Sequence, residues 1–141
     1  MLAFAFFGLA RMRTLVALAI CLTSTVGVSE EAATLRVVDL PRNGGQLLGR
    51  RVTVTDCAFA KATATHAICA PSSSANPGGP TLLLRTRDMT NETFDRLLRS
   101  CSQSADAAAE LCRGSATGRL DKVGDGWQLS DVVIVWGDPP R

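Results

Sequence analysis

The sequence predicts a mainly β domain with one helix, in the order strand, strand, strand, helix, strand, strand. Three observations support this: segments that alternate apolar and polar residues, one amphipathic segment with a capping residue, and turn sequences rich in glycine, proline and serine. The first strand is expected at 50–60 (RRVTVTDCAFA), whose first half alternates as a half-buried strand does. The second and third strands are expected at 65–70 (THAICA) and 81–87 (TLLLRTR), with a loop between them at 71–80 (PSSSANPGGP).

The single clear helix is expected to begin after Thr90, whose hydroxyl can cap the first turn. Met89 and Phe94 occupy the two positions of a hydrophobic staple around that cap. Apolar residues then recur at the spacing of one helix face, at Phe94, Leu97, Leu98 and Cys101. Residues 104–111 contain good helix formers and are expected to extend this helix or to form a second short one.

The last two strands are expected at 114–123 and 126–136, as a hairpin turned by Val-Gly-Asp-Gly. Before the first strand, residues 34–40 (TLRVVDL) predict a lead-in strand that ends at the turn sequence PRNGG. The sequence GDPPR then predicts an irregular tail.

In this order of elements the chain resembles the small exported bacterial domains with an OB fold, a five-stranded barrel whose helix lies between the third and fourth strands. The likeness rests on GRRVTV in the first strand, LLRSC…CRGSATGRL from helix to fourth strand, and GWQLSDVVIV in the last strand. It covers roughly residues 49–136 and depends on order and spacing, not on a diagnostic motif. The resemblance implies a closed barrel, which also removes the exposed edges of a small sheet. The alternative fold is an open α+β sheet with the helix packed on it.

The N-terminal 29 residues have the pattern of a secretory signal peptide. From Met12 onward a basic residue, an apolar run and then small residues follow one another. Because residues 1–10 carry no charge, the true start of translation is expected at Met12. The predicted organisation is a signal peptide at 1–29, a lead-in segment at 30–48, an OB-like domain at 49–137 and a tail at 138–141. The protein is therefore expected to be exported, to the periplasm or outside the cell.

Two other interpretations of the leader place the protein at a membrane. The leader could be an uncleaved anchor, although each of its apolar runs is shorter than the roughly 20 residues that a spanning helix needs. Cys21 could carry a lipid, but Ile20 stands where a lipobox requires a small residue. Cleavage and export fit the pattern better than either.

The four cysteines that follow the leader predict two disulfides, because an even number of cysteines in a small exported domain is typical of a disulfide framework. The favoured pairs are Cys57 with Cys69, between the first two strands, and Cys101 with Cys112, between the helix and the fourth strand. Nonlocal pairings remain open. A zinc site that uses His66 is disfavoured because structural zinc sites prefer cysteines two to four residues apart. A redox Cys-x-x-Cys motif is absent from the sequence.

No catalytic constellation is recognisable in the sequence, and we expect a protein without enzymatic activity, metal or cofactor. His66 is the only histidine, and no nucleophile is marked as its partner. The serines at 72–74 lack the G-x-S-x-G context of a nucleophile elbow. Asp121, Asp125 and Asp131 do not have the spacing of a calcium loop.

The OB resemblance implies a ligand-binding face on the second and third strands, flanked by the first–second and fourth–fifth loops. Carried onto this sequence, the face contains Lys61, His66, Arg85, Arg87 and Trp127. Arg85 and Arg87 alternate along the predicted third strand, so they are expected to form a small patch that favours anions. The competing interpretation is that these arginines lie on a solvated face.

We therefore expect a binding module for a protein, an envelope component or a small anionic ligand. The alternative is a structural or assembly domain that an uncleaved leader holds at the membrane. Nucleic acid is a disfavoured partner: Arg11 and Arg13 lie in the leader, so the 15 basic and 13 acidic residues leave a formally neutral mature chain. The sequence leaves open the identity of the partner and the oligomeric state.

Overall fold

The structure, a computed structural model, describes residues 31–72, 79–102 and 111–137. The strands are β1 (Ala33–Arg36), β2 (Arg51–Ala60), β3 (His66–Pro71), β4 (Leu82–Arg85), β5 (Arg113–Val123) and β6 (Gly126–Trp136). The α-helices are α1 (Leu40–Asn43) and α2 (Asn91–Ser100), and the 3-10 helices are η1 (Val37–Asp39), η2 (Gly44–Leu47) and η3 (Thr86–Asp88).

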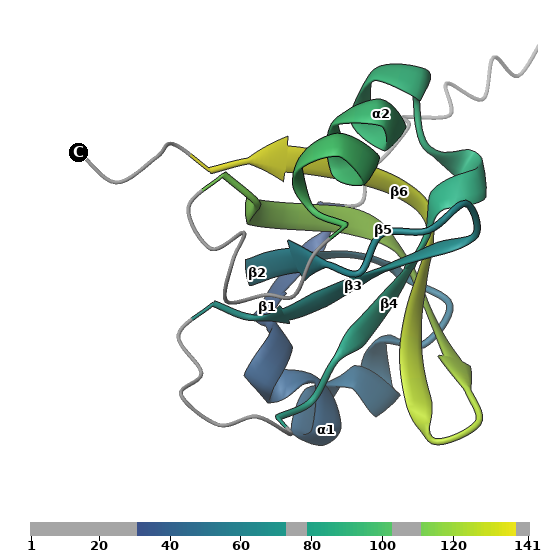
Figure 1. The fold of residues 1–141 in the computed structure, drawn as a ribbon. Helices are drawn as coiled ribbons and strands as arrows, with labels where there is room; N and C mark the ends of the chain where they lie inside the picture. The colour runs from purple at the N-terminus through teal and green to yellow at the C-terminus, as the bar shows by residue number, and fades with distance from the viewer. Residues whose placement is uncertain (1–30, 73–78, 103–110, 138–141) are drawn as a thin grey trace, which may run out of the picture.

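Five of the strands form a closed barrel, as Figure 1 shows. Their order around the barrel is β2-β3-β4-β6-β5, and a pairing between β2 and β5 closes it. The neighbours β4 and β6 are parallel, whereas the other four contacts are antiparallel. The predicted OB-like barrel, with its helix α2 between the third and fourth strands of the barrel, is confirmed, and the open sheet is excluded by the β2–β5 pairing.

The long strand β2 makes closure possible because it bends at a β-bulge. Its first half pairs with β5, from Arg51 opposite Arg119 to Val54 opposite Ala116, and the register then shifts before Cys57. Asp56 stands in the bulge with a φ of 63°, a left-handed conformation that kinks the strand. Beyond it, residues 57–60 pair with β3.

The core fills the barrel with side chains from every strand. The largest fully buried residues include Phe59, Leu82, Leu84, Leu120 and Leu129. Helix α2 covers one end of the barrel and buries Leu97 completely. The helix also contacts β6, where Cζ of the Arg96 guanidinium lies 4.1 Å from the centroid of the Trp136 ring. The Trp136 ring in turn packs edge to face against Phe59, with the ring centroids 5.4 Å apart.

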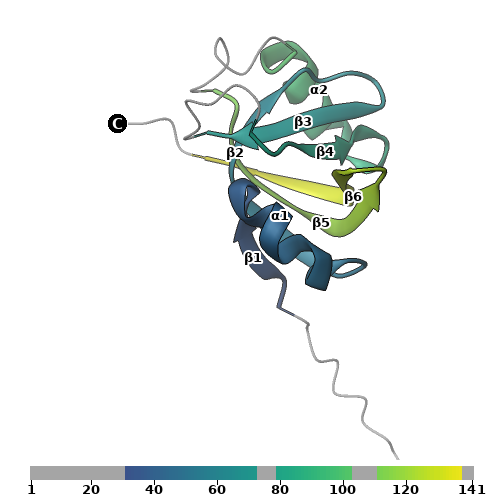
Figure 2. The same ribbon diagram turned by 90° about the horizontal axis from the view of Figure 1, so that it is seen from below.

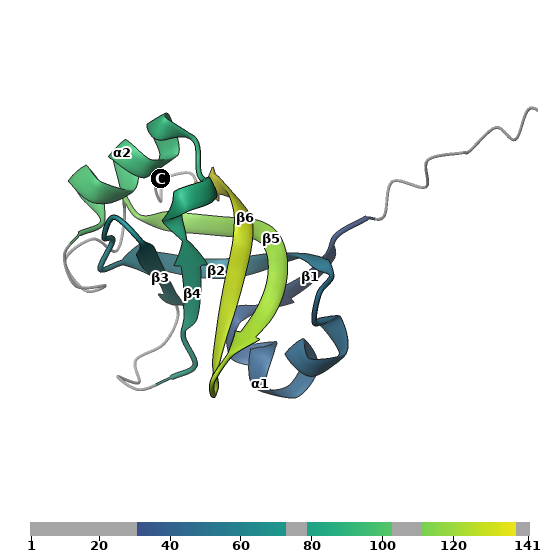
Figure 3. The ribbon, with the colours of Figure 1, turned by 90° about the vertical axis from the view of Figure 1, so that its right-hand side faces the viewer.

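The segment from Val37 to Leu47 corrects the sequence prediction of a strand at 34–40 followed by a turn. Only β1 is a strand, paired in parallel with β2, and η1, α1 and η2 follow it without a break. Pro41 can stand in the first turn of α1 because its missing N–H has no helical acceptor there. Val37 and Leu40 lie on one side of these short helices and are fully buried, so they close the end of the barrel opposite α2 (Figures 1 and 3).

Strand β1 lies outside the five-stranded barrel, beside the first half of β2 (Figure 2). Arg36 at its end donates hydrogen bonds from Nε and Nη2 to Asp39, at 3.0 and 3.4 Å. These hydrogen bonds lower the pKa of Asp39 from its ordinary value and raise that of Arg36.

The remaining expectations differ from the structure mainly at element ends. Helix α2 begins after Thr90 as predicted, and Thr90 Oγ1 accepts from the backbone N–H of Thr93. The hairpin of β5 and β6 is confirmed, with β5 one residue longer than expected. The leader at 1–29, most of the loop at 71–80, residues 104–110 of the possible helix and the tail at 138–141 lie outside the described residues. Within the described ranges, none of the helices has the length and apolar character needed to cross a bilayer.

Candidate functional site

All four cysteines after the leader are joined in disulfides. Cys57 is bonded to Cys69 with the Cα atoms 5.0 Å apart, and Cys101 to Cys112 with the Cα atoms 5.8 Å apart. These are the two pairs that the sequence favoured. The disfavoured zinc site would use Cys57 and Cys69 together with His66. Because these two cysteines form a disulfide with each other, neither can bind a metal as a thiolate.

The structure divides the five residues of the predicted binding face between two places. His66 and Arg85 are directly opposite each other on β3 and β4, near the exposed Lys61 in the β2–β3 connection. Trp127 is on β6 opposite Leu82, at the other end of β4 from Arg85. The predicted continuous face is thus not formed.

Arg85 and Arg87 do not alternate along a strand, contrary to the sequence prediction. Strand β4 ends at Arg85, and Arg87 lies in the 3-10 helix η3. The chain turns here because Thr86 is buried and its hydroxyl donates to the Ala64 carbonyl at 2.9 Å, which ties η3 to the β2–β3 connection. Arg85 is moreover ion-paired with Asp88, at 3.7 Å between Nη2 and Oδ2, so its charge is partly neutralised.

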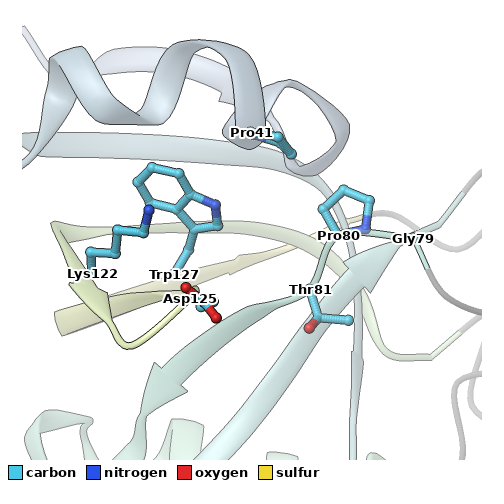
Figure 4. A pocket seen from close by; sticks show the side chains of 8 residues that line it. Pro41, Gly79, Pro80, Thr81, Lys122, Asp125 and Trp127 are labelled. Atoms are coloured by element: carbon cyan, nitrogen blue, oxygen red, sulfur yellow. The ribbon is translucent and has the colours of Figure 1, made fainter.

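Trp127 instead lines a hollow at the α1 end of the barrel (Figure 4). The hollow has a volume of about 410 Å³. Three segments that are distant in sequence form its walls: the start of α1, the end of the β3–β4 loop, and the β5–β6 hairpin. The lining residues are Pro41, Gly79, Pro80, Thr81, Lys122, Asp125, Gly126 and Trp127.

The indole of Trp127 is fixed from two sides. A Cβ on Gly44 would lie 2.8 Å from Cη2 and 2.9 Å from Cζ3 of the indole, so only glycine leaves room for the six-membered ring. Lys122, the cross-strand partner of Trp127, places its Nζ 5.3 Å from the ring centroid, within the range of a cation–π contact. The tryptophan is 9% exposed. The close packing against Gly44 therefore restricts the orientation of the ring.

The indole nitrogen is on the edge of the ring that faces Pro80 (Figure 4). Among the residues that the structure describes, it has no hydrogen-bond acceptor, and its N–H is not fully enclosed by protein. An indole N–H can only donate. The fixed ring thus presents a donor to the hollow.

Two opposite charges border the hollow without neutralising each other. Lys122 and Asp125 are both exposed, and neither forms an ion pair with any residue in the described ranges. Four other aspartates, by contrast, are paired with arginines: Asp39 with Arg36, Asp88 with Arg85, Asp95 with Arg99, and Asp121 with Arg119. Thr81 adds a hydroxyl that can donate or accept. The hollow therefore combines an apolar wall of Pro41 and Pro80 with a few separate polar groups.

Of the lining residues, the sequence pointed only to Trp127. The Gly-Asp-Gly turn is evident in the sequence, but the only ligand that the sequence suggests for Asp125 is calcium, for which the spacing is wrong. Pro41 could not be placed because the sequence predicted a turn where a helix forms. The one local signal that could have helped is Lys122, since a two-residue hairpin turn makes it the cross-strand neighbour of Trp127.

The sequence matches no protein-family model, and no curated protein matches it significantly. Among solved structures, the chain is similar to a protein from Leishmania major Friedlin assigned as an aspartyl-tRNA synthetase, with a TM-score of 0.42 and 10% sequence identity. The likeness covers 80% of this chain and 22% of that one. At this TM-score and identity, nothing about function follows for this chain.

Proposed function

We propose that this protein is an exported, non-enzymatic binding module and that its ligand occupies the hollow at Trp127. One observation carries the proposal: the indole of Trp127, packed against Gly44, faces a cavity of about 410 Å³. Its N–H group has no acceptor among the residues that the structure describes. Small-molecule sites are typically largely preformed hollows of roughly 300–1,000 Å³ that combine apolar walls with a few polar groups. The Trp127 hollow has these properties.

The place of the hollow in the fold supports the same proposal. Lys122, Asp125 and Trp127 flank the connection between the fourth and fifth strands of the barrel, which is a ligand-binding element in OB folds. This support is an analogy of fold and does not identify a ligand. The two disulfides are compatible with an oxidising, exported location, where such bonds persist.

The ligand is a small polar molecule or a short exposed segment of a partner protein or envelope component. A purely anionic ligand is less favoured than the sequence suggested, because Asp125 borders the hollow beside Lys122. The second group of predicted residues, around His66 and Arg85, is less favoured, because Arg85 is already paired with Asp88.

The proposal is tested by titrating the disulfide-bonded protein with free amino acids, short peptides, mono- and disaccharides and dicarboxylates. The indole N–H resonance of Trp127 in a ¹⁵N-labelled sample reports occupancy, and Trp136→Phe assigns the two indole signals. A ligand of the hollow should shift the Trp127 signal in a saturable way and leave that of Trp136 unchanged.

Two pairs of substitutions then locate the site. Thr81→Ala with Lys122→Ala should weaken binding at least tenfold, whereas Arg85→Ala with Arg87→Ala, at the opposite end of the barrel, should leave it unchanged. If the arginine pair abolishes binding and the Thr81 and Lys122 pair does not, the ligand site lies at the His66 end and the proposal is wrong. The absence of any Trp127 shift across the whole set would also contradict it.

A further inference from the structure

We propose that the ligand of the Trp127 hollow is a zwitterion, a small molecule with a cationic nitrogen and a carboxylate or phosphate group, such as a free amino acid or a short peptide. This inference rests on the proposed function and gives the chemical class of its ligand. It starts from the two charges at the β5–β6 turn.

Lys122 and Asp125 are three residues apart around a tight turn, in which Val123 pairs with Gly126. The two side chains do not form an ion pair with each other in the described structure. Instead, Lys122 extends toward the indole of Trp127, and its Nζ lies 5.3 Å from the ring centroid (Figure 4). The hairpin therefore holds one positive and one negative charge apart at the rim of the same hollow.

Three donors of the hollow are suited to an anionic group: the ammonium of Lys122, the indole N–H of Trp127 and the hydroxyl of Thr81. The carboxylate of Asp125 accepts hydrogen bonds only, and it suits an ammonium group. A lone anion would meet repulsion from Asp125, and a lone cation would meet repulsion from Lys122. A zwitterion satisfies both charges, which is the electrostatic complementarity that gives a site its specificity.

A carbohydrate fits the same hollow less well. Stacking of a sugar on tryptophan needs an open ring face, but the indole is 9% exposed and Lys122 lies over the ring. The free part of the indole is the N–H edge, which recognises an acceptor atom and not a flat apolar surface. Saccharides are therefore the competing class in the test.

The test titrates the ¹⁵N-labelled, disulfide-bonded protein with free amino acids, dipeptides and glycerophosphoethanolamine. For the best binder among the amino acids and dipeptides, the N-acetylated, C-amidated and doubly blocked forms are compared. The free zwitterion should shift the Trp127 indole signal, and blocking either end should weaken binding at least tenfold. Glycerophosphoethanolamine carries a phosphate in place of a carboxylate. If it binds more tightly than every amino acid and dipeptide, the natural ligand is a phospholipid headgroup; if it binds more weakly, the natural ligand carries a carboxylate.

Two charge variants assign each end of the ligand. With Lys122→Gln, amidation of the ligand should no longer weaken binding, while acetylation still should; Asp125→Asn should give the converse. Lys61→Gln, an exposed lysine at the opposite end of the barrel, is the matched control and should change neither.

The outcomes separate this inference from the proposed function. If the doubly blocked form binds as tightly as the free one, or if only a saccharide or a dicarboxylate shifts the Trp127 signal, the hollow is a binding site but the zwitterion inference is wrong. If no compound of either set shifts the signal, the proposed function fails together with it.

Discussion

Gly44 and Trp127 lie 83 positions apart in sequence, yet each determines what the other can be. Gly44 has a φ of −61° and a ψ of −34°, which any residue can adopt, so its backbone does not require glycine. The requirement is steric, because the indole occupies the space of a Cβ. The contact holds the six-membered ring in place and leaves the N–H edge toward the hollow.

Gly44→Ala should therefore destabilise the protein by about 1–3 kcal/mol, the usual cost of forcing an extra methyl group into a packed contact. It should also move the indole, which would change the fluorescence of Trp127 in a Trp136→Phe background. The free energy of unfolding from urea titration measures the first effect.

Gly45→Ala is the matched control, since a Cβ at Gly45 meets nothing within 4 Å. This substitution should leave stability unchanged or raise it by up to about 1 kcal/mol, because alanine restricts the unfolded chain. Equal losses in both variants would show that the Gly44 contact with the indole is not the cause.

At the scale of single elements, α2 and α1 differ in how far the sequence could predict them. Helix α2 has its own signals, with the cap at Thr90 and apolar residues that repeat at helical spacing up to the buried Leu97. Helix α1 has four residues, too few to show any period, and it forms because Val37 and Leu40 are buried in the end of the barrel. Its one local signal was Pro41, which also occurs in turns.

The cap of α2 predicts a measurable contribution to stability. Thr90→Ala removes the oxygen that accepts from the Thr93 N–H and should cost about 1 kcal/mol in the free energy of unfolding. Thr90→Ser keeps that oxygen and should stay close to the wild type. Urea titrations of the two variants provide the comparison, and an equal loss in both would mean that the methyl group of Thr90, not its hydroxyl, matters.

At the scale of the whole molecule, the barrel could be predicted but most of its candidate site could not. The order of strands and helix, the two disulfides and the β5–β6 hairpin follow from local patterns. The hollow is lined by the start of α1, the end of the β3–β4 loop and the hairpin, which are distant in sequence and come together only in the folded barrel. Likewise, the predicted alternation of Arg85 and Arg87 along one strand is wrong because β4 ends at Arg85. The buried Thr86 that follows donates a hydrogen bond to the Ala64 carbonyl, a contact that no local pattern shows.

The two disulfides close loops of nearly equal length, because the bonded cysteines are 12 and 11 positions apart in the sequence. Loop entropy alone then predicts nearly the same contribution from each, about 3 kcal/mol. Their surroundings differ, however. Cys57 and Cys69 are on strands that already pair between residues 57–60 and 68–71, whereas the Cys101–Cys112 bond joins a helix end to a strand start.

We therefore expect that Cys101→Ala with Cys112→Ala lowers the free energy of unfolding by about 3 kcal/mol and also loosens α2, because few other bonds tie its end to the barrel. Hydrogen exchange should then accelerate in α2 more than in β2 and β3. Cys57→Ala with Cys69→Ala should cost a similar free energy while exchange accelerates evenly through the barrel. An even pattern in both variants would mean that α2 is held by Leu97 and the Arg96–Trp136 contact and does not depend on its disulfide.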